Sequence, residues 1–142
     1  NVIAIASGMA QGMGFGDNTR ATLITRGLAE MTRLGIVLGG DPGTFAGLAG
    51  IGDLIATCAS TQSRNNMVGR RLGEGETIDA IVESMNMVAE GVKSCPSVLE
   101  LARAAGVEMP ITEQVVAVCH EGRSARDALT ALMDRDAKSE LR

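Results

Sequence analysis

Aromatic side chains are almost absent from this sequence, which contains no tryptophan, no tyrosine and only two phenylalanines among its 142 residues. The apolar residues are therefore nearly all aliphatic or methionine, and a core built from them favours helices over sheets. Nucleic-acid bases stack on the rings that are missing here, and a net charge of −4 disfavours a polyanion. We expect no nucleic-acid partner, and the local cluster of Arg64, Arg70 and Arg71 suggests a small anion instead.

Cysteine and histidine are also scarce, with only Cys58, Cys95, Cys119 and His120 in the chain. An odd number of widely spaced cysteines without a CxxC pair supports neither a disulfide framework nor a zinc site. No apolar run approaches the roughly 18 residues that a membrane span needs, and no charged segment precedes Val2–Ile5 as in a signal peptide. We therefore expect a cytoplasmic protein without a metal site or a membrane span.

Two other patterns are interpreted as structural. Cys119 and His120 could form a nucleophile and base, but neighbouring residues of a helix point about 100° apart, so we assign the pair a structural role. Several methionines fall near helix ends and apolar faces, where core filling is favoured over a partner-binding groove. These methionines are Met85, Met87, Met109 and Met133.

Helical patterns cover most of the chain, and no hairpin signal appears in it. The predicted helices occupy residues 17–38 (capped by Asp17-Asn18), 42–45, 64–72, 77–85, 90–105, 110–120 and 124–133. Residues 134–142, rich in charges of both signs, are predicted to be a solvated tail. We predict an all-α fold, a helical bundle of about seven or eight helices that forms one domain over residues 1–142.

The opening of the chain allows two interpretations. Residues 2–6 could form a strand before a glycine-rich nucleotide loop, or a helix that ends in the turn at residues 12–16. A dinucleotide fingerprint requires a second strand after the first helix, and the sequence shows none, so we favour the helix. Asn1 is not a start methionine and apolar sequence follows at once, so we also expect a further segment upstream.

A carboxylate, a hydroxyl and a guanidinium are close in sequence in the middle of the chain. Asp53 and Thr57 are four residues apart and would share one face of a helix. Ser63 can cap a following helix whose free N–H groups, together with Arg64 and Asn65, suit a phosphate. The alternative is an ordinary capped helix with solvated Arg and Asn side chains, and spacing alone does not decide between the two.

Seven segments, taken in this order and spacing, resemble the C-terminal, substrate-binding domain of bacterial NAD(P)-dependent glycerol-3-phosphate dehydrogenases. They are NVIAI at 1–5, GFGDNTRA at 14–21, LITRGLAEM at 23–31, GDL at 52–54, SRN at 63–65, VAEG at 88–91 and VEMPITE at 107–113. The resemblance implies an all-α domain of the 6-phosphogluconate dehydrogenase C-terminal-like type, preceded by a Rossmann domain. It also implies hydride transfer between NAD or NADP and glycerol 3-phosphate, with dihydroxyacetone phosphate as the ketone, in phospholipid precursor synthesis.

The resemblance further implies roles for individual residues. The family's catalytic lysine lies just before the segment that begins with Asn1, so this chain alone is expected to be inactive without its Rossmann domain. Implied substrate contacts are Asn1, Asp53, Thr57, Ser63, Arg64 and Asn65, and implied cofactor contacts are Arg64, Val88 and Glu90. Asp53 would orient the lysine rather than act as the base, and Arg64 would couple phosphate binding to domain closure.

Other functions stay open from the sequence. The chain could be a catalytically silent helical module for binding or dimerisation. The family often forms dimers, so the resemblance implies a homodimer as a partner. It could also belong to an enzyme for another phosphorylated or carboxylated hydroxy compound, because an arginine suits either anion.

Overall fold

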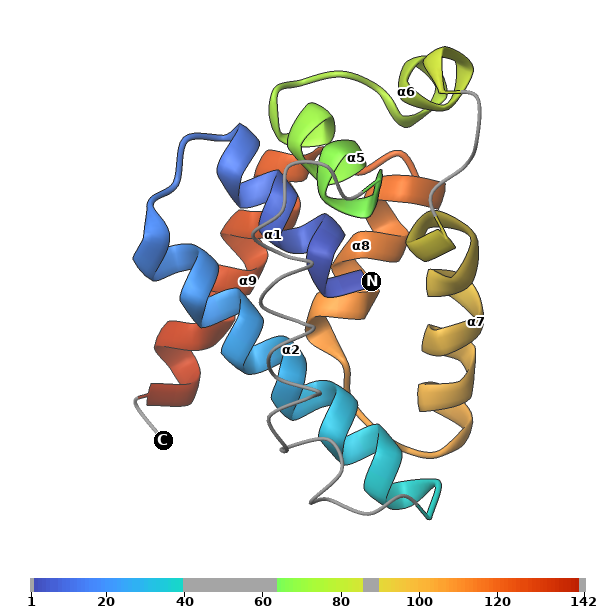
Figure 1. The fold of residues 1–142 in the computed structure, drawn as a ribbon. Coiled ribbons are helices and arrows are strands. Elements are labelled where there is room, and N and C mark those ends of the chain that lie inside the picture. Colours follow the sequence, from blue (N-terminus) through green and yellow to red (C-terminus); the bar gives the residue numbers. More distant parts are fainter. Residues whose placement is uncertain (1, 40–63, 86–89, 141–142) are drawn as a thin grey trace.

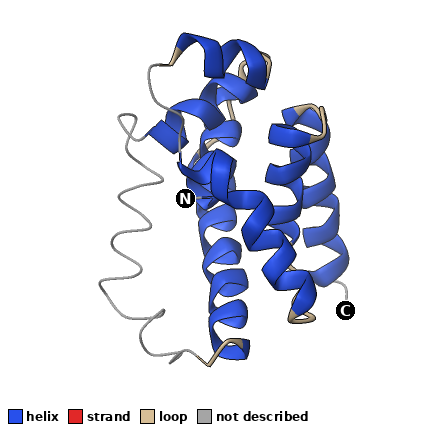
Figure 2. Cartoon of the chain, turned by 90° about the vertical axis from the view of Figure 1, so that its right-hand side faces the viewer, coloured by secondary structure: helices blue, strands red, loops and turns tan. Residues whose placement is uncertain are grey.

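The computed structural model of the chain describes residues 2–39, 64–85 and 90–140, apart from the side chains of residues 90 and 135–140. The described helices are α1 (Val2–Gly12), α2 (Asp17–Val37), α5 (Arg64–Gly73), α6 (Ile78–Ser84), α7 (Glu90–Ala104), α8 (Pro110–His120) and α9 (Ala125–Glu140). Helices and their connections account for all of the described residues, with no strand among them (Figure 2). The predicted all-α fold is confirmed, while the predicted short helix at 42–45 lies outside the described residues.

Helix α1 lies at the centre of the bundle. Its residues from Val2 to Ala10 are all buried, and it contacts α2, α5, α7, α8 and α9 (Figure 1). A helix that is apolar on every side is stable only where other elements cover every side. The opening segment is therefore a helix, and the alternative of a strand before a nucleotide loop is excluded.

The backbones of α1 and α5 approach each other more closely than ordinary side chains permit. A Cβ atom on Gly69 would overlap the main-chain carbonyl oxygen of Ile5, and one on Gly73 would overlap that of Met9. Gly8 on α1 faces the α5 backbone in the same way. Because glycine has no Cβ, the two helices touch backbone to backbone, and they run in the same direction.

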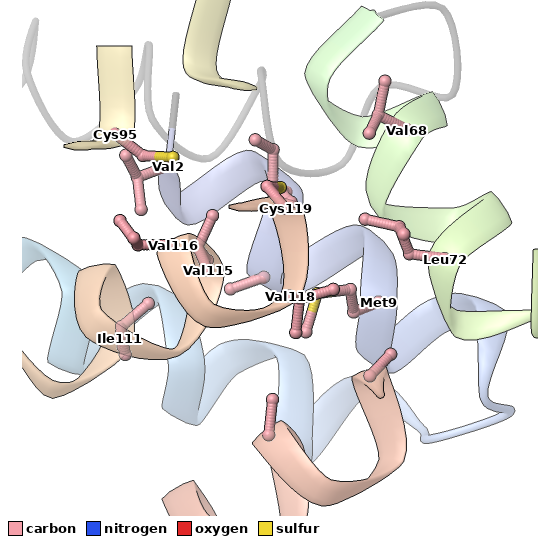
Figure 3. Packing of buried hydrophobic residues seen from close by; sticks show 14 of the residues in the cluster. Val2, Met9, Val68, Leu72, Cys95, Ile111, Val115, Val116, Val118 and Cys119 are labelled. Carbon is pink, nitrogen blue, oxygen red and sulfur yellow. The ribbon is translucent and has the colours of Figure 1, made fainter. Parts of the chain in front are cut away.

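The main hydrophobic core joins α1 to the helices from α5 to α9. Figure 3 shows Met9 of α1, Leu72 of α5 and Val118 of α8 among its buried side chains. The buried members of this cluster are aliphatic or contain sulfur, as the composition predicts. Met109 is buried, and Met85 and Met133 pack at the edges of core clusters, which confirms that they fill the core. Met87 lies outside the described residues.

Several predicted helix boundaries are confirmed by capping contacts. The Thr77 hydroxyl accepts a 3.2 Å hydrogen bond from the N–H of Ala80 at the start of α6. The Ser124 hydroxyl accepts a 3.1 Å bond from the N–H of Asp127 at the start of α9. Helix α7 ends just before Gly106, which adopts a φ of +73°.

One predicted helix end and one predicted cap are wrong. Helix α9 continues to Glu140 and does not end at residue 133, so residues 134–140 of the expected tail are helical. This segment contains Arg, Ala, Lys and Glu, which readily extend a helix that is already nucleated. Helix α2 is capped by Gly16 without a side-chain bond, while Asp17 lies inside the first turn and pairs with Arg20 at 2.5 Å.

None of the helices that the structure describes combines the length and the apolar character that a crossing of the membrane requires.

Candidate functional site

The predicted contact residues that the structure describes lie at the starts of two helices. Arg64 and Asn65 begin α5, and Glu90 is the first residue of α7, described here by its backbone alone. The other predicted contacts lie outside the described residues; they are Asn1, Asp53, Thr57, Ser63 and Val88.

A buried hydrogen bond joins the first turns of α5 and α7. The Oδ1 atom of Asn65 accepts a 2.8 Å hydrogen bond from the main-chain N–H of Gly91. The first N–H groups of a helix have no partner within that helix, so Asn65 supplies a cap to α7 from a different helix. The structure thereby brings together Asn65 and Gly91, which belong to two segments that we had selected separately from the sequence.

The starts of α1, α5 and α7 lie in one region of the molecule. Helices α1 and α5 are parallel, and Gly8 of α1 faces the backbone of Asn66 in the first turn of α5. Figure 3 shows Val2 of α1 near Cys95 of α7, and both belong to the main core. The starts of α5 and α7 each carry roughly half a positive charge from their aligned peptide dipoles. The combination therefore creates a positive potential that suits an anion.

Arg64 adds a full positive charge to this region. Its side chain is exposed, and the first turn of α5 contains no acidic residue. A guanidinium offers a planar set of donors that matches the oxygens of a phosphate or carboxylate. The geometry thus supports the anion-binding interpretation of residues 64 and 65.

Arg71 does not belong to this region, contrary to the expected cluster of three arginines. It lies in the last turn of α5 and bonds both carboxylate oxygens of Glu76, at 2.8 and 2.7 Å, and the Ser84 hydroxyl at 2.6 Å. This pairing raises the pKa of Arg71 and lowers the pKa of Glu76. Arg71 thus connects α5 to α6, because it lies about two turns after Arg64, in the last turn of the helix.

Cys95, Cys119 and His120 form a separate group between α7 and α8. The Nε2 atom of His120 lies 2.7 Å from the carbonyl oxygen of Val92, and the Cys95 thiol donates to the same oxygen at 3.5 Å. The neighbouring Cys119 thiol, with a smaller effect of His120, lowers the pKa of Cys95 to about 7, whereas the contact with Cys95 and burial raise the pKa of Cys119. Both cysteines are free and buried. The contact of the imidazole with a main-chain carbonyl agrees with the structural role that we predicted.

Among the described residues, no group of three or more His, Cys, Asp or Glu side chains is placed to hold a metal ion.

A cavity of about 700 Å³ lies between the ends of α1 and α5 and the start of α9. Residues around it include Gly12, Glu76 and Arg126. Neither Arg64 nor Asn65 lines it, so it is separate from the candidate site.

Two groups with hydrogen bonds between helices were not predicted from the sequence: one buried acidic side chain and one main-chain N–H group. Glu30 of α2 is only 4% exposed, and its Oε1 atom accepts a 2.9 Å hydrogen bond from the N–H of Ile111 in α8. The signal in the sequence was Pro110, which begins α8 without an N–H and leaves that of Ile111 in need of an acceptor. The N–H of Gly91 had no comparable signal, because its acceptor comes from another helix.

Comparison with known proteins shows one consistent relationship. The sequence matches the family described as "NAD-dependent glycerol-3-phosphate dehydrogenase C-terminus" over residues 1–130. A glycerol-3-phosphate dehydrogenase (NAD(P)+) from Streptomyces coelicolor is 59% identical over 142 residues, all of this chain, and one from Geobacter sulfurreducens is 58% identical over 140 residues, 99% of it. The chain spans 42% of the length of each of these curated relatives.

A solved structure agrees with this match. The crystal structure of a glycerol-3-phosphate dehydrogenase from Coxiella burnetii is similar with a TM-score of 0.88 and 42% sequence identity. The similarity covers 93% of this chain and 41% of that protein.

Proposed function

This chain belongs to the family of NAD-dependent glycerol-3-phosphate dehydrogenase C-termini, and from this premise we propose that it forms the substrate-binding part of such an enzyme. The reaction is the interconversion of glycerol 3-phosphate and dihydroxyacetone phosphate with NAD or NADP. The observation that carries the proposal is the family match over residues 1–130. The converging helix starts beside Arg64 support it, because they suit the phosphate of both compounds.

In this proposal the phosphate is held at the start of α5. Arg64 supplies a charged, forked donor, Asn65 a neutral donor and Ser63 a hydroxyl. The remaining proposed substrate contacts are Asn1, Asp53 and Thr57. Asp53 favours the charged form of a nearby lysine, so it orients that group instead of serving as the base.

The nicotinamide cofactor donates or accepts the hydride when it is bound. An exposed guanidinium beside the joined starts of α5 and α7 fits a dinucleotide, whose phosphates are negatively charged. The proposed cofactor contacts in this chain are Arg64, Val88 and Glu90. Gly91 contributes its N–H to Asn65 and not to the cofactor.

The proposal also names partners and a place of action. A Rossmann domain of the same protein would bind most of the cofactor and carry the catalytic lysine, and two copies would form a homodimer. We place the enzyme in the cytoplasm, where phosphorylated three-carbon compounds and nicotinamide cofactors are found together.

The test measures NADH oxidation by the complete polypeptide that contains residues 1–142, with dihydroxyacetone phosphate as substrate. Arg64→Ala should raise the KM for this substrate about 100-fold, the effect of a lost charge-assisted hydrogen bond, and Arg64→Lys should recover only part of it. The same variant should leave the weak activity towards unphosphorylated dihydroxyacetone nearly unchanged. Arg126→Ala, which changes an exposed arginine on α9, is the matched control and should behave as the wild type.

Each other outcome points to a different function. A complete wild-type polypeptide without turnover would contradict the dehydrogenase and favour a silent binding module. Turnover of a carboxylated hydroxy compound in preference to the phosphorylated one would indicate a related enzyme with another substrate.

A further inference from the structure

The side chain of Asn65 has two chemically different ends, and the structure decides which of them faces α7. The main-chain N–H of Gly91 can only donate a hydrogen bond, so the Asn65 atom 2.8 Å away is the acceptor Oδ1. The other end of the amide, Nδ2, is a donor. Nδ2 is therefore the end that can donate a hydrogen bond to an anion at the start of α5.

We propose that the hydrogen bond between Asn65 and Gly91 is a positioning contact with two effects. It presents the amide of Asn65 to the substrate phosphate with the donor end forward. It also holds the start of α7, where the cofactor contacts are proposed, against the phosphate site. The inference rests on the proposed function and adds a coupling between the two ligands.

Burial makes this bond a strong constraint. Asn65 is 8% exposed, and Gly91 is also buried, so neither group can exchange its partner for water without a local opening. A buried N–H that loses its acceptor is costly, and the first turn of α7 would have to shift or unwind to reach another. A substitution of Asn65 should therefore change the affinity for the cofactor, because it shifts the backbone of α7.

Two substitutions separate the two effects. Asn65→Asp keeps an oxygen for the N–H of Gly91 but replaces the donor with a negatively charged oxygen. Asn65→Ala removes both the acceptor and the donor. In the complete polypeptide we expect Asn65→Asp to raise the KM for dihydroxyacetone phosphate about 100-fold, while the Gly91 amide keeps the slow hydrogen exchange of the wild type.

Asn65→Ala should weaken the binding of both ligands. We expect a similar rise in the KM for dihydroxyacetone phosphate, together with a rise of about tenfold in the Kd for NADH. Hydrogen exchange at the Gly91 amide, followed by NMR, provides a direct readout of the bond. Exchange should be slow in the wild type and in Asn65→Asp, and at least about tenfold faster in Asn65→Ala.

The control removes a helix cap of the same kind elsewhere. Ser124→Ala deletes the hydroxyl that caps α9, so it tests whether any lost cap weakens NADH binding. The Kd for NADH should not change in this variant. Circular dichroism of each variant shows whether it is folded, and if Asn65→Ala is not, hydrogen exchange at Gly91 in the wild type and in Asn65→Asp still tests the bond.

The outcomes distinguish this inference from the proposed function. Fast exchange at Gly91 in the wild type, or an NADH affinity that is equal in Asn65→Ala and the wild type, would overturn the positioning role whatever the activity. Fast exchange at Gly91 in Asn65→Asp would overturn it as well, because this variant keeps the acceptor oxygen. Absence of turnover in the wild type would overturn the proposed function, and the exchange and NADH-binding measurements would still decide on the contact.

Discussion

Glu30 illustrates at the residue scale how a buried acidic side chain is used inside a helical bundle. Its carboxylate meets the N–H of Ile111 at the start of α8, where the helix dipole is positive and Pro110 offers no donor. An acidic side chain at a helix start gains from both the hydrogen bond and the dipole. Glu30 therefore connects α2 to α8, and this contact offsets the cost of burying its side chain.

Replacement of Glu30 should test the value of this cap. Glu30→Ala leaves the buried N–H of Ile111 without its acceptor and should lower the free energy of unfolding by about 1–3 kcal/mol. Glu30→Gln keeps an oxygen acceptor and should lose clearly less. Urea unfolding followed by circular dichroism measures both, because the chain contains no tryptophan or tyrosine for fluorescence. An equal loss in the two variants would contradict the capping role.

Individual residues also show what the sequence could predict at this scale. Ser124 and Thr77 cap the helices whose starts were predicted at residues 124 and 77, because a cap is a contact between residues only three positions apart. Arg71 was assigned to an anion site and instead pairs with Glu76 and Ser84. A local contact can be read from spacing, whereas the direction of a long side chain depends on which helix face is buried.

At the scale of elements, the contact between α1 and α5 determines the position of the candidate site. Both helices carry glycines four residues apart, and these glycines face each other's backbones. The starts of the two helices consequently lie on the same side of the molecule. This contact places Arg64 and Asn65 next to the start of α1.

Gly69→Ala tests the helix contact against intrinsic helix propensity. Propensity alone predicts that alanine stabilises α5 by roughly 0.5–1 kcal/mol. The new Cβ would instead overlap the carbonyl oxygen of Ile5, and we expect a loss of about 3 kcal/mol in the free energy of unfolding. The affinity for dihydroxyacetone phosphate should fall as well, because the start of α5 moves. Urea unfolding and the KM for this substrate measure the two effects.

A glycine in open space serves as the control for this prediction. Gly16 caps α2 with a φ of −82°, and a Cβ there would meet nothing within 4 Å. Gly16→Ser should therefore change the free energy of unfolding by less than about 0.5 kcal/mol. A stabilised Gly69→Ala variant would show that α1 and α5 do not approach each other as described.

The whole molecule is organised around α1, which has no exposed face between Val2 and Ala10. The main core includes residues from α1, α2 and every described helix from α5 to α9. A core shared so widely should be lost in a single step. The prediction that residues 1–142 form one domain can be tested on this basis.

We predict that residues 1–142 unfold cooperatively in urea. In a Cys58→Ser background, Cys95 and Cys119 are the remaining thiols, and both are buried in the core. Their labelling by an alkylating reagent should begin at the same urea concentration at which circular dichroism records the loss of helix. Labelling at a clearly lower concentration, or two separate transitions, would contradict a single domain.

The sequence by itself determined the helical class, most helix boundaries and the kind of chemistry to be expected near residues 63–65. Aliphatic residues at helical spacing, and caps such as Ser124 or Pro110, act within one or two turns, so they are visible along the chain. The composition also determined a core without aromatic packing.

Only the tertiary structure decided which helix starts meet. The contacts of Asn65 with Gly91 and of Glu30 with Ile111 join residues 26 and 81 positions apart. Such contacts depend on the direction and depth at which two helices pack, and this is set by shape, as at Gly69, where the absence of a single Cβ permits the approach. Helical periodicity specifies the face that is buried, but it does not specify the partner against which that face is buried.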